Sequence, residues 1–177
     1  MSKRRTALLL ALILALAACG ACGEAAFRGY SKQDGYQYVI FGNYPYDRDG
    51  TVKPLMWKVL SVTDDGLALL ITNQVIDAYP MQYIEGKVDL KTYKGYRKIS
   101  SYEESDLYPW MNSEMLTTML TEEEQAVLDD SRGKLFLLTR QEFLMPEYGF
   151  STAVYGTLIK SRVCKCTGYA SKRGVYS

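Results

Sequence analysis

The chain of 177 residues contains no histidine, the side chain most often used for acid–base chemistry near neutral pH. Ser-His-Asp and Cys-His catalysis, and His-ligated zinc or iron sites, are therefore excluded for this chain. It also has no Gly-x-Gly-x-x-Gly or Walker sequence to hold nucleotide phosphates. We expect no cofactor and no bound metal.

Clustered carboxylates are the remaining candidates for acid–base chemistry. Glu103-Glu104 and Glu122–Glu124 lie at predicted helix starts, where negative charge stabilises the helix dipole, and we favour that structural role. Asp47 and Asp49, followed by Gly50, resemble the start of a calcium loop, but no acid follows at the spacing of the bidentate ligand. Asp-Gly is also typical of a hairpin turn, which is the favoured interpretation.

Cys164 and Cys166 are separated by one residue. In a strand this spacing sends the two thiols to opposite faces, so a bond between them would be strained. No second pair is present to complete a structural zinc site. We expect small, half-buried cysteines, with a soft-metal or redox role as the alternative.

Trp57 and Trp110 are the only tryptophans. Both are expected to anchor the packing of a helix against a sheet. The alternative is a platform on which a sugar or a peptide stacks. Because Tyr108 and Asn112 flank Trp110, these three form the candidate ligand-binding set. Asn112 could instead satisfy nearby backbone groups.

Three apolar runs, rich in β-branched and aromatic residues and separated by turn signals, predict consecutive antiparallel strands over about 36–41, 55–63 and 67–72. Asp64-Asp65-Gly66 predicts a hairpin between the second and the third. Residues 80–104 combine lysines and arginines with tyrosines. A base-stacking patch would show this composition, but interspersed acids favour a long solvated loop.

The sequence after residue 104 contains signals for helix starts. Ser105 is a plausible N-cap for a helix that carries Trp110, and Thr121 with Glu124 forms a capping box for a second helix. An apolar strand is expected at 135–138, and a second capping box at 139–142 predicts a helical turn at 143–144. The predicted fold class is α+β: an antiparallel β-meander packed against two or three short helices.

The N-terminus has the features of a targeting segment. Lys3, Arg4 and Arg5 precede an apolar run over 6–18 that is too short for a stable membrane span. We expect a signal peptide at 1–18, a tether at 19–34 and a domain at 35–177. Removing the leader leaves a near-neutral chain, so we expect no nucleic-acid partner.

The segment Leu16-Ala17-Ala18-Cys19 resembles the bacterial lipobox, which implies lipid on Cys19 and attachment to the outer face of the cell membrane. The alternative is secretion after cleavage near Ala18 or Ala21, without lipid.

The ordered landmarks resemble a bacterial family catalogued as domain of unknown function 6273. The matching segments are Val39–Pro45, Trp57–Leu60, Leu69–Ile71, Ser105–Asn112, Phe136–Thr139 with Glu142, and Arg162 with Thr167–Ala170. Tyr108 stands where the family usually has Arg. The family pattern also continues into further strands, so the resemblance implies that this chain is truncated at its C-terminus.

By analogy, the family pattern is similar to the C-type-lectin-like fold of the formylglycine-generating enzymes, but a fold does not determine a function. The expected function is an extracytoplasmic, lipid-anchored binding domain for a glycan or peptide ligand. The alternatives are an enzyme of formylglycine-generating or carboxylate-based type, and a non-functional fragment. The copper-dependent chemistry of formylglycine generation is not favoured, because the supporting motif around Cys164 and Cys166 is absent.

Overall fold

A computed structural model describes residues 30–33, 36–83, 97–153, 161 and 163–175. The predicted leader, the lipobox and Cys19 lie outside the described residues. Among the residues described, no helix combines the length and apolar character needed to cross a membrane.

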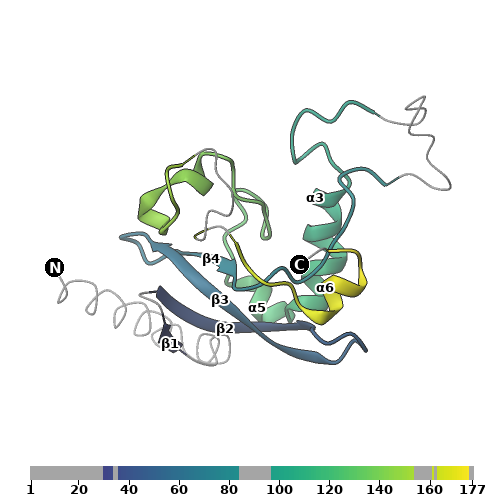
Figure 1. The fold of residues 1–177 in the computed structure, drawn as a ribbon. Helices are drawn as coiled ribbons and strands as arrows, with labels where there is room; N and C mark the ends of the chain where they lie inside the picture. The colour runs from purple at the N-terminus through teal and green to yellow at the C-terminus, as the bar shows by residue number, and fades with distance from the viewer. Residues whose placement is uncertain (1–29, 34–35, 84–96, 154–160, 162, 176–177) are drawn as a thin grey trace.

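The architecture is an antiparallel sheet with short helices, which confirms the predicted α+β fold (Figure 1). Its strands are β1 (Tyr30–Gln33), β2 (Tyr36–Pro45), β3 (Val52–Val62) and β4 (Ala68–Thr72). They pair in chain order, β1-β2-β3-β4, as a meander. The sheet includes β1, which forms from residues assigned by sequence to the tether.

The predicted end of the first strand at Gly42 is wrong, because β2 continues to Pro45. The register shifts between Ile40 and Asn43, which marks a β-bulge. Gly42 has φ +68°, a backbone conformation that glycine adopts without a steric cost. The bulge therefore lets one strand run past a residue that usually interrupts strands.

The predicted hairpin at 64–66 is present, and Gly66 N–H donates to the Thr63 carbonyl at 3.1 Å. It joins β3 to β4, with Lys58 opposite Ile71. Because β4 is the last strand in the order, only one of its edges is paired within the described part of the chain.

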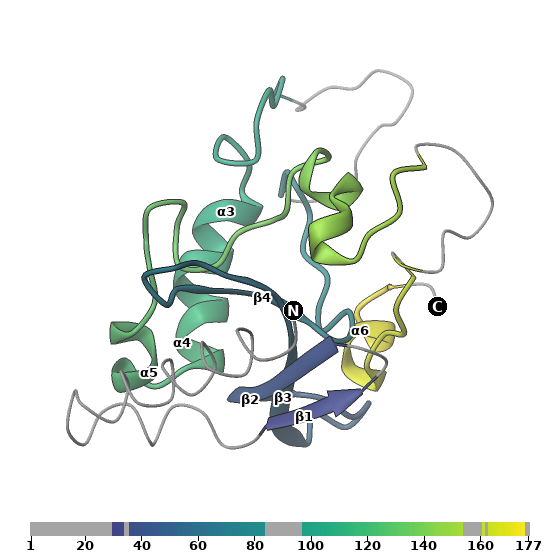
Figure 2. The ribbon, with the colours of Figure 1, turned by 90° about the vertical axis from the view of Figure 1, so that its left-hand side faces the viewer.

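A helical segment covers one face of the sheet. It comprises α3 (Leu107–Trp110), the π-helical turn η1 (Met111–Met115) and α4 (Leu116–Met119), which follow one another without a break. Figure 2 shows this segment rising in one column beside the sheet. The predicted N-cap at Ser105 is wrong: Asp106 precedes the first residue of α3, and its side chain forms no capping hydrogen bond. Ser105 Oγ accepts from Tyr108 N–H only at 3.4 Å.

Both predicted capping boxes are confirmed. Thr121 and Glu124 exchange side-chain and backbone hydrogen bonds at the start of α5 (Glu122–Ala126). Thr139 and Glu142 do the same, and the short 3₁₀ helix η2 (Glu142–Leu144) follows. A second 3₁₀ turn, η3 (Pro146–Tyr148), comes next.

The predicted strand at 135–138 is not formed: these residues have no ladder partner in the structure. Their apolar side chains suit a strand, but sheet formation also requires a neighbouring strand at the correct register.

The core lies between the sheet and the helical segment. Trp57 on β3 is buried, and its Nε1–H donates to the Phe41 carbonyl at 2.7 Å. Met115, Leu116 and Met119 pack into the same cluster from the helices, and the partly buried Trp110 packs against it. Trp57 and Trp110 therefore contribute to one core, as the helix-on-sheet interpretation predicts.

The C-terminal helix α6 (Gly168–Lys172) docks against the segment after β4. Val75 and Cys166 form an isolated parallel bridge, and Thr167 N–H donates to the Val75 carbonyl at 2.9 Å. Thr167 is buried and caps α6 by accepting from Ala170 N–H at 3.0 Å. In Figure 1, α6 lies beside the hairpin between β2 and β3.

Candidate functional site

A largely apolar cleft of about 1340 Å³ lies between β4 and the residues that face it. One wall is β4 with the segment after it. The opposite wall is residues 134–138, called here the facing segment. The helical segment contributes Trp110, Met111 and Met115 to the lining. The volume exceeds the range of about 300–1000 Å³ that is usual for small-molecule pockets.

Both walls of the cleft have backbone groups without strand partners. Only the β3 side of β4 is paired in the part of the chain that the structure describes. The facing segment belongs to no sheet in the described structure, and it begins with a bend at residues 134–135. Unpaired strand edges present rows of N–H and C=O groups that another chain can bind.

Exposed apolar side chains gather around this cleft. Four of the eight large hydrophobic residues exposed in the described structure line it: Leu67, Val127, Leu137 and Val163. Leu137, on the facing segment, is 45% exposed. Large exposed apolar patches commonly mark binding sites, so this concentration favours the cleft over the rest of the described surface.

The facing segment is held in place from both ends. Asn112 on η1 donates from Nδ2 to the Leu135 carbonyl at 2.8 Å and accepts from Leu135 N–H at 3.0 Å. Arg132 lies over the Phe136 ring at 4.1 Å and forms an ion pair with Glu142. Hydrogen bonds from Arg132 lower the pKa of Glu142 to about 2, although its partial burial opposes this.

Two lysines of the cleft lining have no acidic partner among the described residues. They are Lys134 and the exposed Lys165, and neither forms an ion pair with another described residue. Of the two acids in the lining, Asp77 is paired with Arg173, whereas Asp129 accepts only from the neutral hydroxyl of Ser131, at 2.5 Å, and keeps its charge. Two lysines without an ion pair outnumber this one acid, so the uncompensated charge of these residues is positive.

The sequence-predicted residues Tyr108, Trp110 and Asn112 lie in different surroundings. Trp110 lines the cleft and stacks on Tyr79, with ring centroids 4.4 Å apart and planes 9° from parallel. The carboxamide of Asn112 bonds the backbone of Leu135 and, at 3.2 Å, the Tyr108 carbonyl. This is the backbone role that the sequence left open for Asn112.

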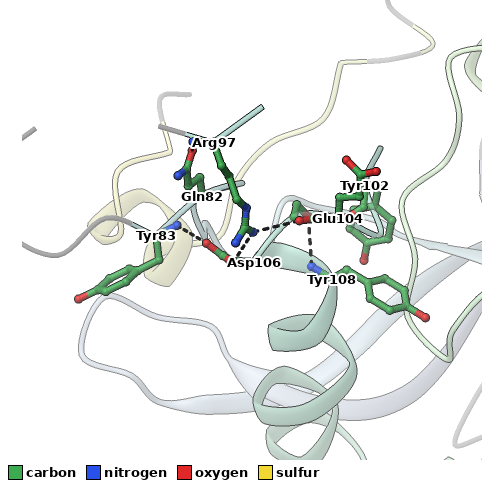
Figure 3. A network of polar contacts seen from close by, with 8 residues as sticks. Gln82, Tyr83, Arg97, Tyr102, Glu104, Asp106 and Tyr108 are labelled. Carbon is green, nitrogen blue, oxygen red and sulfur yellow. Dashed lines mark hydrogen bonds and ion pairs between the residues drawn. The ribbon is translucent and has the colours of Figure 1, made fainter. Parts of the chain in front are cut away.

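Tyr108 packs edge-on against Tyr102, with ring centroids 5.2 Å apart. Burial raises the pKa of Tyr102 to about 12, with a smaller contribution from Tyr108. Figure 3 shows both rings pointing away from the ion pair of Arg97 and Asp106. Neither Tyr108 nor Asn112 lines the cleft.

A polar network fixes the chain at the start of α3 (Figure 3). Asp106 accepts from Tyr83 N–H at 2.7 Å and forms an ion pair with Arg97 at 2.5 Å. The hydrogen bond from Tyr83 N–H is the largest cause of a lowered pKa of Asp106, and the hydrogen bond from Arg97 is the next largest. Arg97 also donates to the Glu104 carbonyl at 3.0 Å. A smaller, polar depression of about 500 Å³ lies here, lined by Tyr79, Tyr83, Arg97, Asp106, Pro109, Trp110, Ser113 and Glu114.

A second polar cluster is buried beneath α6. Tyr44 donates to Asp77 Oδ2 at 2.6 Å, and Arg173 forms an ion pair with the same carboxylate. Only 3% of the Asp77 side chain is exposed. Burial and the hydrogen bond to Asp77 raise the pKa of Tyr44. Every polar group of the cluster has a partner, so we interpret it as an attachment of the C-terminal segment.

The acidic residues considered as metal or acid–base sites form turn and helix-capping contacts instead. Asp47 pairs with Lys53, and Asp49 accepts from Thr51 N–H at 2.9 Å, which is hairpin-turn geometry. Glu124 serves in a capping box. No group of three potential ligands occurs within the described residues. Cys164 is exposed and Cys166 half-buried, and both are free thiols.

Sequence reasoning missed the cleft-lining residues Leu67, Val127, Leu137 and Val163. One signal was available for Leu137: it belongs to a run that is apolar on both faces, and such a run needs partners on both sides. Leu67 and Val127 adjoin the ends of β4 and α5, and Val163 lies in an irregular segment, so hydrophobic periodicity does not identify them.

Comparisons with known proteins provide no independent assignment: the chain matches no family model, no curated protein and no solved structure.

Proposed function

We propose that this chain is a lipid-anchored, extracytoplasmic binding domain whose ligand occupies the cleft between β4 and the facing segment. The observation that carries the proposal is the cleft itself, about 1340 Å³ in volume, with exposed apolar side chains around it. Burying these side chains under a ligand would contribute roughly 25 cal/mol for each Å² of apolar surface removed from water.

Binding is better supported than catalysis. The chain has no histidine, and the carboxylates of the cleft lining, Asp77 and Asp129, are bonded to Arg173 and Ser131. A carboxylate-based enzyme needs two acids that converge on one substrate position, and the described lining provides no such pair. A formylglycine-generating activity has no support beyond the analogy of fold.

The cleft can be tested with the apolar fluorescent dye 1-anilinonaphthalene-8-sulfonate. We expect saturable binding to the folded protein, and a loss of most of that binding in Leu137→Glu, which places a charge on the cleft wall. Val52→Glu is the matched control, because Val52 is 58% exposed but does not line the cleft. Equal dye binding by the two variants, or none by the parent protein, would refute a ligand site in the cleft.

The anchor is tested separately, in bacterial cells that process lipoproteins. We expect the parent chain to incorporate a clickable palmitate and to sediment with membranes. Cys19→Ser should abolish the label and release the protein, while Cys22→Ser should do neither. A Cys19→Ser protein that stays on the membrane would contradict lipidation at this residue.

A further inference from the structure

The geometry points to an extended peptide as the ligand, which binds as an added strand along β4 and carries acidic residues that face the lysines of the cleft lining. This inference rests on the proposed binding function of the cleft and specifies the chemical class of its ligand.

The backbone of β4 is the first argument. Its outer edge has no partner in the described structure, and every residue of β4, on both faces of the strand, lines the cleft. The N–H and C=O groups of a strand edge bind another extended backbone in register, at a spacing of about 4.8 Å between strands. A lipid or a small aromatic molecule would leave these groups without partners.

The size and lining of the cleft are the second argument. In an extended peptide, successive side chains point to opposite faces, so alternate residues can enter an apolar site while the others face away. Trp110, Met111 and Met115 line the cleft, and Leu137 is exposed on its opposite wall. This arrangement provides contacts for alternate apolar side chains, which is how strand-adding domains obtain specificity.

The charges of the lining are the third argument. Lys134 and Lys165 lie in the lining from two different parts of the chain, and neither has an acidic partner among the described residues. Complementary charges accelerate association and suppress wrong partners. We therefore place the acidic residues of the peptide next to these two lysines.

A second copy of this chain fits the cleft less well. The free edge of β4 is itself one wall of the cleft, with the facing segment as the other. To pair with that edge, a second copy would have to bring its own cleft walls into the same space. A single extended chain needs only the width of one strand.

The probe is the peptide Glu-Glu-Val-Thr-Val-Thr-Val-Thr-amide with fluorescein on its N-terminal amine, measured by fluorescence anisotropy with the full mature chain. We expect saturable binding and displacement of 1-anilinonaphthalene-8-sulfonate. If the dye binds but the peptide does not, the strand proposal is overturned while the proposed cleft site stands. If neither binds, the proposed function fails as well.

Backbone methylation tests whether the bound peptide forms a strand. Two further peptides carry N-methyl groups on alternate residues, one on the odd positions and one on the even. Methylation removes N–H donors but keeps the side chains, so the version methylated along the β4-facing edge should lose at least about tenfold in affinity. Equal affinities for all three peptides would overturn the proposal.

Charge reversal at the two lysines tests their contact with the acidic residues of the peptide. Lys134→Glu/Lys165→Glu should weaken the acidic peptide about tenfold and strengthen a matched Lys-Lys peptide, and added salt should reduce both effects. The control pair Lys98→Glu/Lys172→Glu is exposed, forms no ion pair with another described residue and lies outside the lining, so it should leave both affinities unchanged. If the parent protein forms dimers, and if dye binding is lost as the dimers form, the cleft is occupied by a second copy of this chain. That result would overturn the peptide proposal.

Discussion

The side chain of Asn112 forms both backbone hydrogen bonds of Leu135, accepting from its N–H at 3.0 Å and donating to its carbonyl at 2.8 Å. The two residues are 23 positions apart. The carboxamide thus takes the place of a strand partner for one residue of the facing segment and fixes one wall of the cleft.

Asn112→Ala should lower the free energy of unfolding by about 1–3 kcal/mol, because it leaves the polar groups of the buried Leu135 without partners. Ser113→Ala is the control: its exposed hydroxyl donates to the Pro109 carbonyl, and the change should cost no more than about 0.5 kcal/mol. Urea denaturation followed by tryptophan fluorescence measures both. Equal midpoints would show that Asn112 does not hold the facing segment.

Trp57→Ala should destabilise the fold by about 3–5 kcal/mol, the usual cost of deleting a large aromatic side chain from a core. Trp57 is 9% exposed and packs between the sheet and the helices. Val52→Ala, on the same strand but at an exposed position, should change stability little. A melting temperature unaffected by Trp57→Ala would contradict the core described above.

Gly42→Ala should be more damaging than Gly50→Ala, although both glycines have positive φ. A Cβ at Gly42 would come within 2.8 Å of the Met119 carbonyl oxygen, whereas nothing lies within 4 Å of one at Gly50. We expect about 3 kcal/mol or more for Gly42→Ala, from backbone strain and overpacking together. Gly50→Ala should cost about 1–2 kcal/mol, from strain alone. Similar losses, measured by calorimetry, would exclude close packing of the bulge against α4.

The ion pair of Glu142 and Arg132 should make stability depend on pH. The pKa of Glu142 is about 2 in the folded chain against 4.5 unperturbed, so its contribution is present above about pH 4.5 and is lost as pH falls toward 2. Glu142→Gln should cost about 1 kcal/mol at pH 7, since water screens an Arg132 side chain that is 42% exposed.

The difference in the free energy of unfolding between Glu142→Gln and the parent protein should disappear near pH 2. The control is Glu147→Gln, which alters an exposed acid nearby and should leave the pH profile unchanged. Denaturation curves at several pH values test this. A constant difference from pH 7 to pH 2 would assign the effect of Glu142→Gln to packing.

Signals within a few residues were sufficient for much of the fold. The capping boxes at Thr121 and Thr139 specify helix starts through bonds between residues three apart, and both are present. The hairpin at 64–66 is similarly local. The strands β2 to β4 follow from apolar and β-branched runs between turns.

Features that depend on distant partners could not be predicted. β1 forms because β2 offers an edge at Tyr36–Val39, although its own sequence carries no strand pattern. Conversely, 135–138 has a strand composition but Asn112 takes the place of a neighbouring strand. Trp110 was predicted as a ligand-binding candidate and lines the cleft, but the remaining walls come together only through tertiary packing.

The docking of α6 has a consequence for how the chain is made. Thr167 and Ile76 are 91 positions apart, and the buried carboxylate of Asp77 is paired with Arg173. Without the segment that carries Thr167 and Arg173, the interior would hold an unmatched charge, which opposes its collapse. Contacts of such long sequence separation also form slowly. Synthesis proceeds from the N-terminus, so the sheet and the first helices are made before the segment that completes this interior.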